Sequence, residues 1–302
     1  MTLRTIVTYP NPEPVQVFTS PGDSKVPRTK PQAVLEQRCN VVYAETRGMG
    51  LVMDVFHSPS RSNGLGLIDV VSQAWQSGRE RLNGHIAMGV MDVLCEEGFT
   101  VFALSPGSAE EFTGQEMVAH VYAGIRYIKE HAHDFAIDPV HLGLTGFSAG
   151  GHLAALAALA PQPATRHPKR PTTHVAAVGL FFPISDLTAF GPSHFGPRAT
   201  STFPDTLLFH DGSAAQDEQS ISGRLSELSP ALHVPANPPP FMLIHGTADE
   251  VVPCAQSEAF AASLRAAGGA VFLITKKDGG HPWPNVRPEL GELGAWFTQV
   301  LQ

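Results

Sequence analysis

Ser148 is the third residue of Gly-Phe-Ser-Ala-Gly-Gly at positions 146–151, between the apolar run 142–144 and the helix-forming stretch 152–156. A serine hydroxyl is a weak nucleophile, so acyl transfer needs a sharp turn that presents it to a base and to N–H donors. The first and fifth glycines lack the Cβ atoms that would crowd the strand against the helix. A glycine-rich turn with an incidental serine would look the same, so the prediction depends on an acid and a histidine further along the chain.

The acid is expected in the segment 241–253, which reads Phe-Met-Leu-Ile-His-Gly-Thr-Ala-Asp-Glu-Val-Val-Pro. Its apolar start predicts a buried strand, and open α/β sheets carry their functional groups at the carboxyl ends of strands. Asp249 is therefore expected to accept an imidazole N–H and to stabilise the imidazolium during attack. Glu250 and Asp186 are the alternative carboxylates, and Asp249 could instead only order the turn before the next helix.

The histidine expected to complete this set is His281, which follows the predicted strand 271–275 on a loop that contains Gly279 and Gly280. From such a loop its ring can reach Ser148 and act first as general base and then as general acid. The chain has 14 histidines. His281 is selected because it completes the order serine, acid, histidine.

Together these three segments resemble the serine esterases of the α/β-hydrolase superfamily, including acetyl-esterase and carbohydrate-esterase relatives. The resemblance extends from about residue 40 to the C-terminus. It implies ester hydrolysis through an acyl-enzyme, without a cofactor, and a small-molecule ester as the partner. It assigns Ser148, Asp249 and His281 to the catalytic triad.

One loop departs from the pattern of these esterases. Many of them carry a His-Gly-Gly-Gly-Trp-type loop that helps to bind the oxyanion, whereas positions 71–75 here read Val-Ser-Gln-Ala-Trp. Backbone donors do not require glycine, so the N–H groups of Ala149, Ser72 and Gln73 are expected to form the oxyanion hole, with the Gln73 side chain as an extra donor. Losing one donor typically costs about 100- to 1000-fold in turnover. Three aromatic side chains are expected to line the substrate pocket: Trp75, Phe147 and Trp283.

Composition narrows the class of protein. The chain has 302 residues, 43% of them hydrophobic, and a mean hydropathy of −0.01, which suits one large core. A net charge of −8 argues against nucleic-acid binding. There is no run of about 20 apolar residues for a membrane span. The N-terminus has no apolar signal-peptide stretch and the three cysteines are scattered, so a cytoplasmic protein with reduced thiols is expected.

Alternating apolar runs predict a mostly parallel central sheet with helices on both faces, and the resemblance implies that this sheet belongs to an α/β-hydrolase fold. Strands are expected at 40–45, 51–56, 67–71, 100–104, 142–144, 175–182, 241–244 and 271–275. Helices are expected at 117–132, where apolar residues recur every three or four positions, at 255–267 and at 290–300.

The domain organisation follows from the segments that do not fit this alternation. Residues 1–36 are rich in Pro, Ser and Thr and are expected to form an extended arm, which could mediate a homo-oligomer. Residues 37–302 are then a single α/β-hydrolase domain. The interval 185–237 is too long for an ordinary loop, so a cap inserted after the sixth strand is predicted, with a packed surface excursion as the alternative.

Three functions remain open at this point. The leading hypothesis is a serine carboxylic-ester hydrolase for short-acyl esters, acetylated carbohydrates included. The Gly-x-Ser-x-Gly-Gly and His-Gly-x-x-Asp-x-Val-Pro motifs also resemble prolyl oligopeptidases, which makes a serine exopeptidase the second. A ligand-binding hydrolase with weak catalysis, owing to the altered loop, is the third. No metal site is expected at His131-Ala-His-Asp134, because residues i and i+2 of a helix point about 200° apart.

Overall fold

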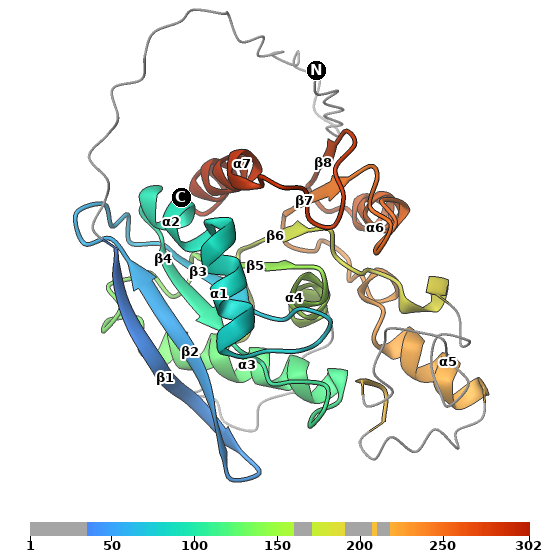
Figure 1. Ribbon diagram of the computed structural model, residues 1–302, viewed down its shortest axis with the longest axis horizontal. Coiled ribbons are helices and arrows are strands. Elements are labelled where there is room, and N and C mark those ends of the chain that lie inside the picture. Colours follow the sequence, from blue (N-terminus) through green and yellow to red (C-terminus); the bar gives the residue numbers. More distant parts are fainter. Residues whose placement is uncertain (1–34, 160–170, 191–206, 210–217) are drawn as a thin grey trace, which may run out of the picture.

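The computed structural model describes residues 35–159, 171–190, 207–209 and 218–302. Their strands form a single eight-stranded sheet in the order β1-β2-β4-β3-β5-β6-β7-β8 (Figure 1). The strands are β1 (Glu36–Thr46), β2 (Met49–His57), β3 (Gly66–Val70), β4 (Thr100–Leu104), β5 (Leu142–Phe147), β6 (Ala177–Phe181), β7 (Phe241–Gly246) and β8 (Val271–Lys276). The predicted strands are confirmed, with ends that differ by a few residues.

The sheet is parallel from β4 to β8, whereas β2 pairs antiparallel with both β1 and β4. In β3, β4, β5, β6 and β7 every residue is buried. Continuous apolar runs of this kind are typical of parallel strands covered on both faces. The predicted α/β-hydrolase architecture is confirmed.

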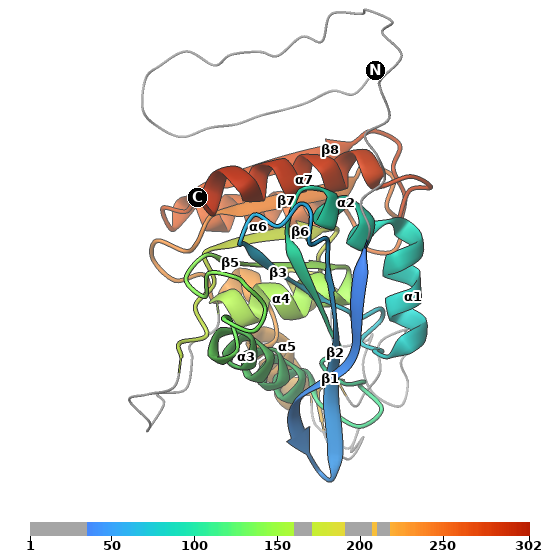
Figure 2. The ribbon, with the colours of Figure 1, turned by 90° about the vertical axis from the view of Figure 1, so that its left-hand side faces the viewer.

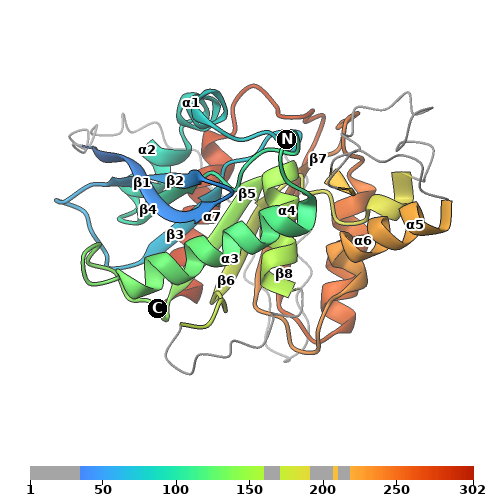
Figure 3. The same cartoon turned by 90° about the horizontal axis from the view of Figure 1, so that it is seen from below.

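Helices cover both faces of the sheet. One face carries α1 (Arg79–Met88), α2 (Val90–Glu96) and α7 (Arg287–Val300), and the other carries α3 (Gly114–Glu130), α4 (Ala149–Leu159) and α6 (Ala255–Ala266). Figure 2 shows α7 and α2 next to each other, and Figure 3, seen from below, shows α3 and α4 side by side in front of the sheet. Successive side chains of β3 alternate between the two cores: Ile68 and Val70 pack on the α3–α4 side, and Leu67 on the α2–α7 side.

The predicted helix at 117–132 is confirmed as α3, which begins one turn earlier. Thr113 caps it: the Thr113 hydroxyl accepts from the N–H of Glu116, and the Glu116 carboxylate accepts from the N–H of Thr113. Its apolar stripe is buried, and Ala132 is also buried although it lies beyond the helix end. The pair α1 and α2 was not predicted, because α1 has few apolar residues and buries only Leu82 and His85.

The predicted cap interval is described only in part. It contains a 3-10 turn at Leu187–Phe190, the helix α5 (Glu218–Glu227) and a second 3-10 turn at Pro230–Leu232. Residues 191–206 and 210–217 of the cap interval, and residues 1–34 of the predicted arm, lie outside the described residues. The cap and the arm therefore stay predictions. None of the described helices has both the length and the apolar character needed to cross a bilayer.

Candidate active site

The turn between β5 and α4 holds Ser148 in an unusual backbone conformation. Its φ is 51°, in the left-handed region that non-glycine residues rarely occupy and that is concentrated at functional sites. The Ser148 N–H donates to the carbonyl of Phe181 at 3.0 Å, which anchors the turn to β6. A Cβ at Gly150 would lie 2.2 Å from the backbone oxygen of Val70, and one at Gly146 would lie 2.6 Å from the backbone of Gly150. The strand and the helix can approach this closely only because both positions are glycine.

Three side chains from the carboxyl ends of β5, β7 and β8 form one hydrogen-bonded chain. The Nε2 atom of His281 lies 2.9 Å from Ser148 Oγ, and its Nδ1 lies 2.7 Å from Asp249 Oδ2. A carboxylate only accepts, so Nδ1–H donates to Asp249, and Nε2 is left to accept the serine proton. The structure thus brings together the three residues that the sequence selected, in the order that nucleophilic attack requires.

Asp249 is held in place by several donors. Its Oδ1 accepts from the N–H groups of Val251 at 2.9 Å and Val252 at 2.8 Å, and its side chain is fully buried. Burial alone would raise the pKa of Asp249, but hydrogen bonds from His245, His281 and the Val252 N–H outweigh it and hold the pKa well below its usual range. The carboxylate of Asp249 is therefore ionised at neutral pH.

The two alternative carboxylates point elsewhere. Glu250 is exposed on the same turn. Asp186 accepts from the N–H and hydroxyl of Thr188 through Oδ1, at 2.8 and 2.5 Å, and from the Ser229 hydroxyl at 3.3 Å. Among the three candidates it is Asp249 that contacts His281.

His245 is a member of this site that the sequence reasoning missed. It is fully buried on β7, and its Nε2 lies 2.8 Å from the carbonyl of Val252 and 3.4 Å from Asp249 Oδ2. A carbonyl only accepts, so Nε2 carries the proton and Nδ1 accepts from the hydroxyl of Ser257 at 2.7 Å. The His-Gly pair ahead of the Asp turn was the signal that could have indicated it.

The loop after β3 lies against the nucleophile turn. Its Ser72 carbonyl accepts from the N–H of Gly150 at 3.0 Å. Ala149 is the first residue of α4, so its N–H has no acceptor within the helix, and the N–H of Ser72 has no partner among the described residues. The expectation that the backbone N–H of Gln73 is an oxyanion donor is wrong: it donates to the carbonyl of Gln76 at 2.9 Å, because the loop closes on itself in a tight turn. Gln73 lines the cavity beside Ser148, and its side chain as an extra donor stays a prediction.

A cavity of about 180 Å³ opens beside Ser148 and His281. Apolar side chains of Phe147, Phe182 and Met88 form part of its wall. The polar part of the wall is made by Ser72, Gln73, Arg81 and His85. Typical sites for drug-sized ligands measure about 300–1,000 Å³, so this cavity suits a small substrate.

Of the three aromatic residues expected in the pocket, only Phe147 lines this cavity. Trp75 is 1% exposed and donates its Nε1–H to Nδ1 of His152 at 3.1 Å. Trp283 is 5% exposed and donates to the carboxylate of Glu289 at 3.1 Å. Both tryptophans turn inward because the buried indole N–H finds its acceptor in the core, so the prediction that they line the pocket is wrong.

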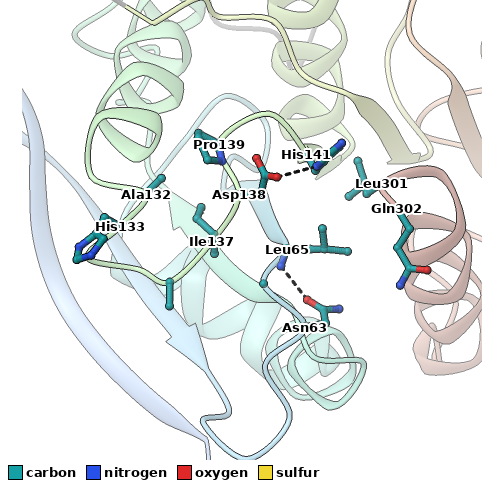
Figure 4. Close-up of a pocket in the computed structure, with 12 residues that line it drawn as sticks. Asn63, Leu65, Ala132, His133, Ile137, Asp138, Pro139, His141, Leu301 and Gln302 are labelled. Carbon is teal, nitrogen blue, oxygen red and sulfur yellow. Dashed lines mark hydrogen bonds and ion pairs between the residues drawn. The ribbon is translucent and has the colours of Figure 1, made fainter.

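A larger hollow of about 860 Å³ lies at the opposite edge of the sheet, near the amino ends of β3 and β5 (Figure 4). Its wall includes Leu65, Ile137 and Leu301, together with the hydrogen-bonded pair Asp138 and His141. Ser148, His281 and Asp249 do not line this hollow. Since open α/β sheets bind ligands at the carboxyl ends of their strands, we place the candidate site at the smaller cavity. No cluster of three or more His, Cys, Asp or Glu side chains suited to a metal ion occurs in the described part of the chain.

Similarity to known proteins agrees with this geometry. Esterase LipQ of Mycobacterium tuberculosis is 29% identical over 235 residues, which cover 76% of this chain and 53% of LipQ. The isoprenylcysteine alpha-carbonyl methylesterase ICME of Arabidopsis thaliana is 27% identical over 72% of this chain and 50% of its own length. The chain thus spans about half the length of these relatives.

Solved structures show the same fold. A truncated carbohydrate esterase from gut microbiota superposes with a TM-score of 0.71 at 23% identity, over 89% of this chain and 97% of that one. The butyrate-bound esterase Est2 of Thermogutta terrifontis superposes with a TM-score of 0.66 at 22% identity, over 91% and 96% of the two chains. The profile of the BD-FAE family matches residues 53–264, which is more than half of the sequence. The chain is therefore an α/β-hydrolase that belongs to the BD-FAE family.

Proposed function

We propose that this protein is a serine carboxylic-ester hydrolase that cleaves small, short-acyl esters through an acyl-enzyme. The observation that carries the proposal is the hydrogen-bonded chain from Ser148 through His281 to a buried, ionised Asp249, at the mouth of a small cavity. The esterases among its relatives support the same reaction class.

In the first half of the reaction, Ser148 Oγ attacks the ester carbonyl carbon while Nε2 of His281 takes the hydroxyl proton. The carbonyl oxygen becomes an oxyanion, and the N–H groups of Ala149 and Ser72 are the donors available to it. The tetrahedral intermediate collapses, the bond to the alcohol breaks, and His281 returns the proton to the leaving alkoxide.

In the second half, a water molecule attacks the acyl-enzyme. His281 takes a proton from the water, and the second tetrahedral intermediate collapses with cleavage of the bond to Ser148 Oγ. His281 returns the proton to Oγ, which restores the serine hydroxyl, and the carboxylic acid leaves. Asp249 stays ionised throughout and stabilises the imidazolium, which its depressed pKa favours. No cofactor is required by these steps.

The size and lining of the cavity support short acyl groups. A volume of about 180 Å³ accommodates an acetyl or similarly small acyl group, and Phe147, Phe182 and Met88 supply apolar contacts. The polar residues of the wall extend the proposal to esters of hydroxylated alcohols such as carbohydrates. A fold shared with a carbohydrate esterase is compatible with this, although it does not select the alcohol.

Replacement of Ser148 by alanine tests the reaction class. We expect the Ser148→Ala variant to fold, to lose p-nitrophenyl acetate turnover and to resist labelling by a fluorophosphonate. The control is Ser60→Ala, at an exposed serine of the β2–β3 connection. This variant should retain both p-nitrophenyl acetate turnover and fluorophosphonate labelling. Full activity in Ser148→Ala would refute the proposal. Turnover of aminoacyl p-nitroanilides by the wild-type protein in preference to esters would favour the exopeptidase hypothesis instead.

A further inference from the structure

The wall of the cavity beside Ser148 carries a cationic side chain from α1. Arg81, Gly84, His85 and Met88 recur at intervals of three and four residues and all line the cavity, so one face of α1 forms this wall. The Arg81 side chain is 32% exposed, so a molecule in the cavity can contact it. A guanidinium stays protonated across the pH range of an enzyme assay, and Arg81 therefore brings a permanent positive charge to the site.

No carboxylate of the cavity wall neutralises this charge. Among the described residues, no Asp or Glu lines the cavity. Two carboxylates lie close to it, and each is paired with a histidine: Oδ2 of Asp69 lies 2.6 Å from Nδ1 of His85. Asp249 pairs with His281 in the same way, at 2.7 Å. In both pairs it is the histidine, and not the carboxylate, that lines the cavity.

The ion pair that Arg81 does make lies outside the cavity wall. Its partner among the described residues is Glu80, with Nη1 of Arg81 3.5 Å from Oε1 of Glu80. The Glu80 side chain is 87% exposed and does not line the cavity. Such a pair contributes little, because water screens the charge of an exposed carboxylate. A ligand anion in the cavity therefore competes with a weak partner.

Arg81 also orients the side chain of Gln73, on the loop after β3. Nη1 of Arg81 lies 3.3 Å from Oε1 of Gln73. A guanidinium only donates, so the amide oxygen must face it and the amide NH₂ group is directed elsewhere. Neither this NH₂ group nor Nη2 of Arg81 has a hydrogen-bond partner among the described residues. Two side chains of one cavity wall thus offer N–H donors for which the described protein supplies no acceptor.

We propose that Arg81, together with the amide NH₂ group of Gln73, binds a carboxylate group of the substrate close to the scissile ester. This inference rests on the proposed esterase function and adds a substrate class to it, small esters that carry a carboxylate. A carboxylate accepts through both oxygens and matches the planar fork of a guanidinium. An uncharged group can accept from the same donors but does not use the charge of Arg81.

The volume of the cavity limits the candidate substrates. About 180 Å³ leaves room for a carboxylate that lies only a few bonds from the ester. Two kinds of molecule have this feature. Half-esters of short dicarboxylic acids carry the carboxylate in the acyl half, and acyl esters of small hydroxy acids carry it in the alcohol half.

The test compares matched esters in which a methyl ketone replaces the carboxylate. Monomethyl succinate against methyl levulinate probes the acyl half, and O-acetylglycolate against acetoxyacetone probes the alcohol half. Hydrolysis is followed by proton release at neutral pH. The readout is the ratio of kcat/KM for the anionic ester to kcat/KM for the neutral ester of the same pair.

We expect Arg81→Gln to lower this ratio about tenfold on one of the two pairs, because a charge-assisted contact of a partly exposed side chain is lost. The pair that responds identifies the half of the substrate that carries the carboxylate. Arg81→Lys keeps the charge without the planar fork, so its ratio should lie between those of wild type and Arg81→Gln. The control is Lys277→Gln, which removes one exposed positive charge away from the cavity wall and should leave both ratios unchanged.

Fluorophosphonate labelling at Ser148 reports whether each variant retains a folded site. If Arg81→Gln does not label, Gln73→Leu carries the test and should lower the ratio about threefold, since it removes one uncharged donor. A role of the Gln73 amide at the oxyanion would affect both esters of a pair equally and would cancel in the ratio.

The outcomes separate this inference from the function on which it rests. Unchanged ratios on both pairs, with Ser148-dependent turnover intact, would overturn the carboxylate subsite and leave the esterase proposal standing. An equal fall in Lys277→Gln would attribute the effect to net charge and would also overturn the subsite. Turnover that survives Ser148→Ala would overturn the esterase proposal itself.

Discussion

The most informative single change is Asp249→Asn, because the surroundings of the carboxylate decide how the amide must sit. Oδ1 of Asp249 accepts from two backbone N–H groups, those of Val251 and Val252. The amide oxygen of an asparagine has to occupy that position, since an NH₂ group there would face two donors. The NH₂ group then points at His281, in the place that Oδ2 held.

This orientation reverses the tautomer of the catalytic histidine. A donor opposite Nδ1 requires Nδ1 to accept, so the proton moves to Nε2, which faces Ser148 at 2.9 Å. Nε2–H cannot accept the serine proton. In a serine hydrolase, the same change of tautomer lowers kcat by about 10,000-fold with the geometry otherwise intact.

The assay is steady-state hydrolysis of p-nitrophenyl acetate. We expect kcat to fall by about this factor while KM changes little, because the cavity wall does not include Asp249. Glu250→Gln, on the exposed neighbouring residue, is the matched control and should retain wild-type kcat. A kcat for Asp249→Asn within about tenfold of wild type would refute the tautomer argument and remove Asp249 from the triad.

Three further predictions follow from the same contacts. In urea unfolding, Gly150→Ala should destabilise the fold by about 3 kcal/mol or more, because its Cβ would lie 2.2 Å from the backbone oxygen of Val70. The control Gly291→Ala, which has open space around it in α7, should stabilise the fold by about 0.5–1 kcal/mol. His152→Leu removes the two hydrogen bonds of this ring, with the Trp75 indole N–H and with the Leu228 carbonyl, and should cost about 1–3 kcal/mol in total. The exposed His133→Leu is the control, and equal unfolding midpoints for the two variants would contradict the prediction. The pKa of Asp249 is lower in the folded protein than its unfolded value of about 3.9, so the ionised carboxylate stabilises the fold above that pH. This contribution is lost as the pH falls through the folded pKa, so the stability difference between wild type and Asp249→Asn should shrink on acidification below about pH 4. A stability difference that grows on acidification would contradict the assigned direction of the pKa shift.

His152 illustrates how the structure joins parts of the chain that are far apart. Its Nε2–H donates to the carbonyl of Leu228 at 2.6 Å while Nδ1 accepts from Trp75, so a neutral ring on α4 connects the segment after α5 to the loop after β3. Burial lowers the pKa of His152 to about 4, which keeps the ring neutral in the range where it makes both bonds. We expect this contact to hold the Ser72 loop against the nucleophile turn.

Several features of this protein could be predicted from the sequence because they depend on local chemistry. Parallel strands buried on both faces read as apolar runs, so the strands around Ser148, Asp249 and His281 were identifiable. The glycines around Ser148 are dictated by a strand-to-helix turn in which Ser148 alone separates β5 from α4. The order serine, acid, histidine then indicated which side chains the sheet would gather at its carboxyl edge.

Other features depended on packing between segments that are distant in the sequence. The inward rotation of Trp75 and Trp283 follows from acceptors supplied by His152 and Glu289, and no local pattern encodes those partners. The N–H of Gln73 is used by a turn that only the folded loop reveals.

The polar wall shows the same limit most clearly. Asp69 and His85 are 16 residues apart, on a strand and on a helix with weak periodicity, and each looks unremarkable in the sequence. Only the packing of α1 onto β3 brings them within 2.6 Å and turns His85 toward the cavity beside Ser148. Sequence alone determined the fold class and the proposed nucleophile, base and acid, because turns and apolar periodicity are local properties. The tertiary structure decided which donors and polar groups are available to hydrogen-bond a substrate, because this availability depends on the positions of all competing hydrogen-bond partners.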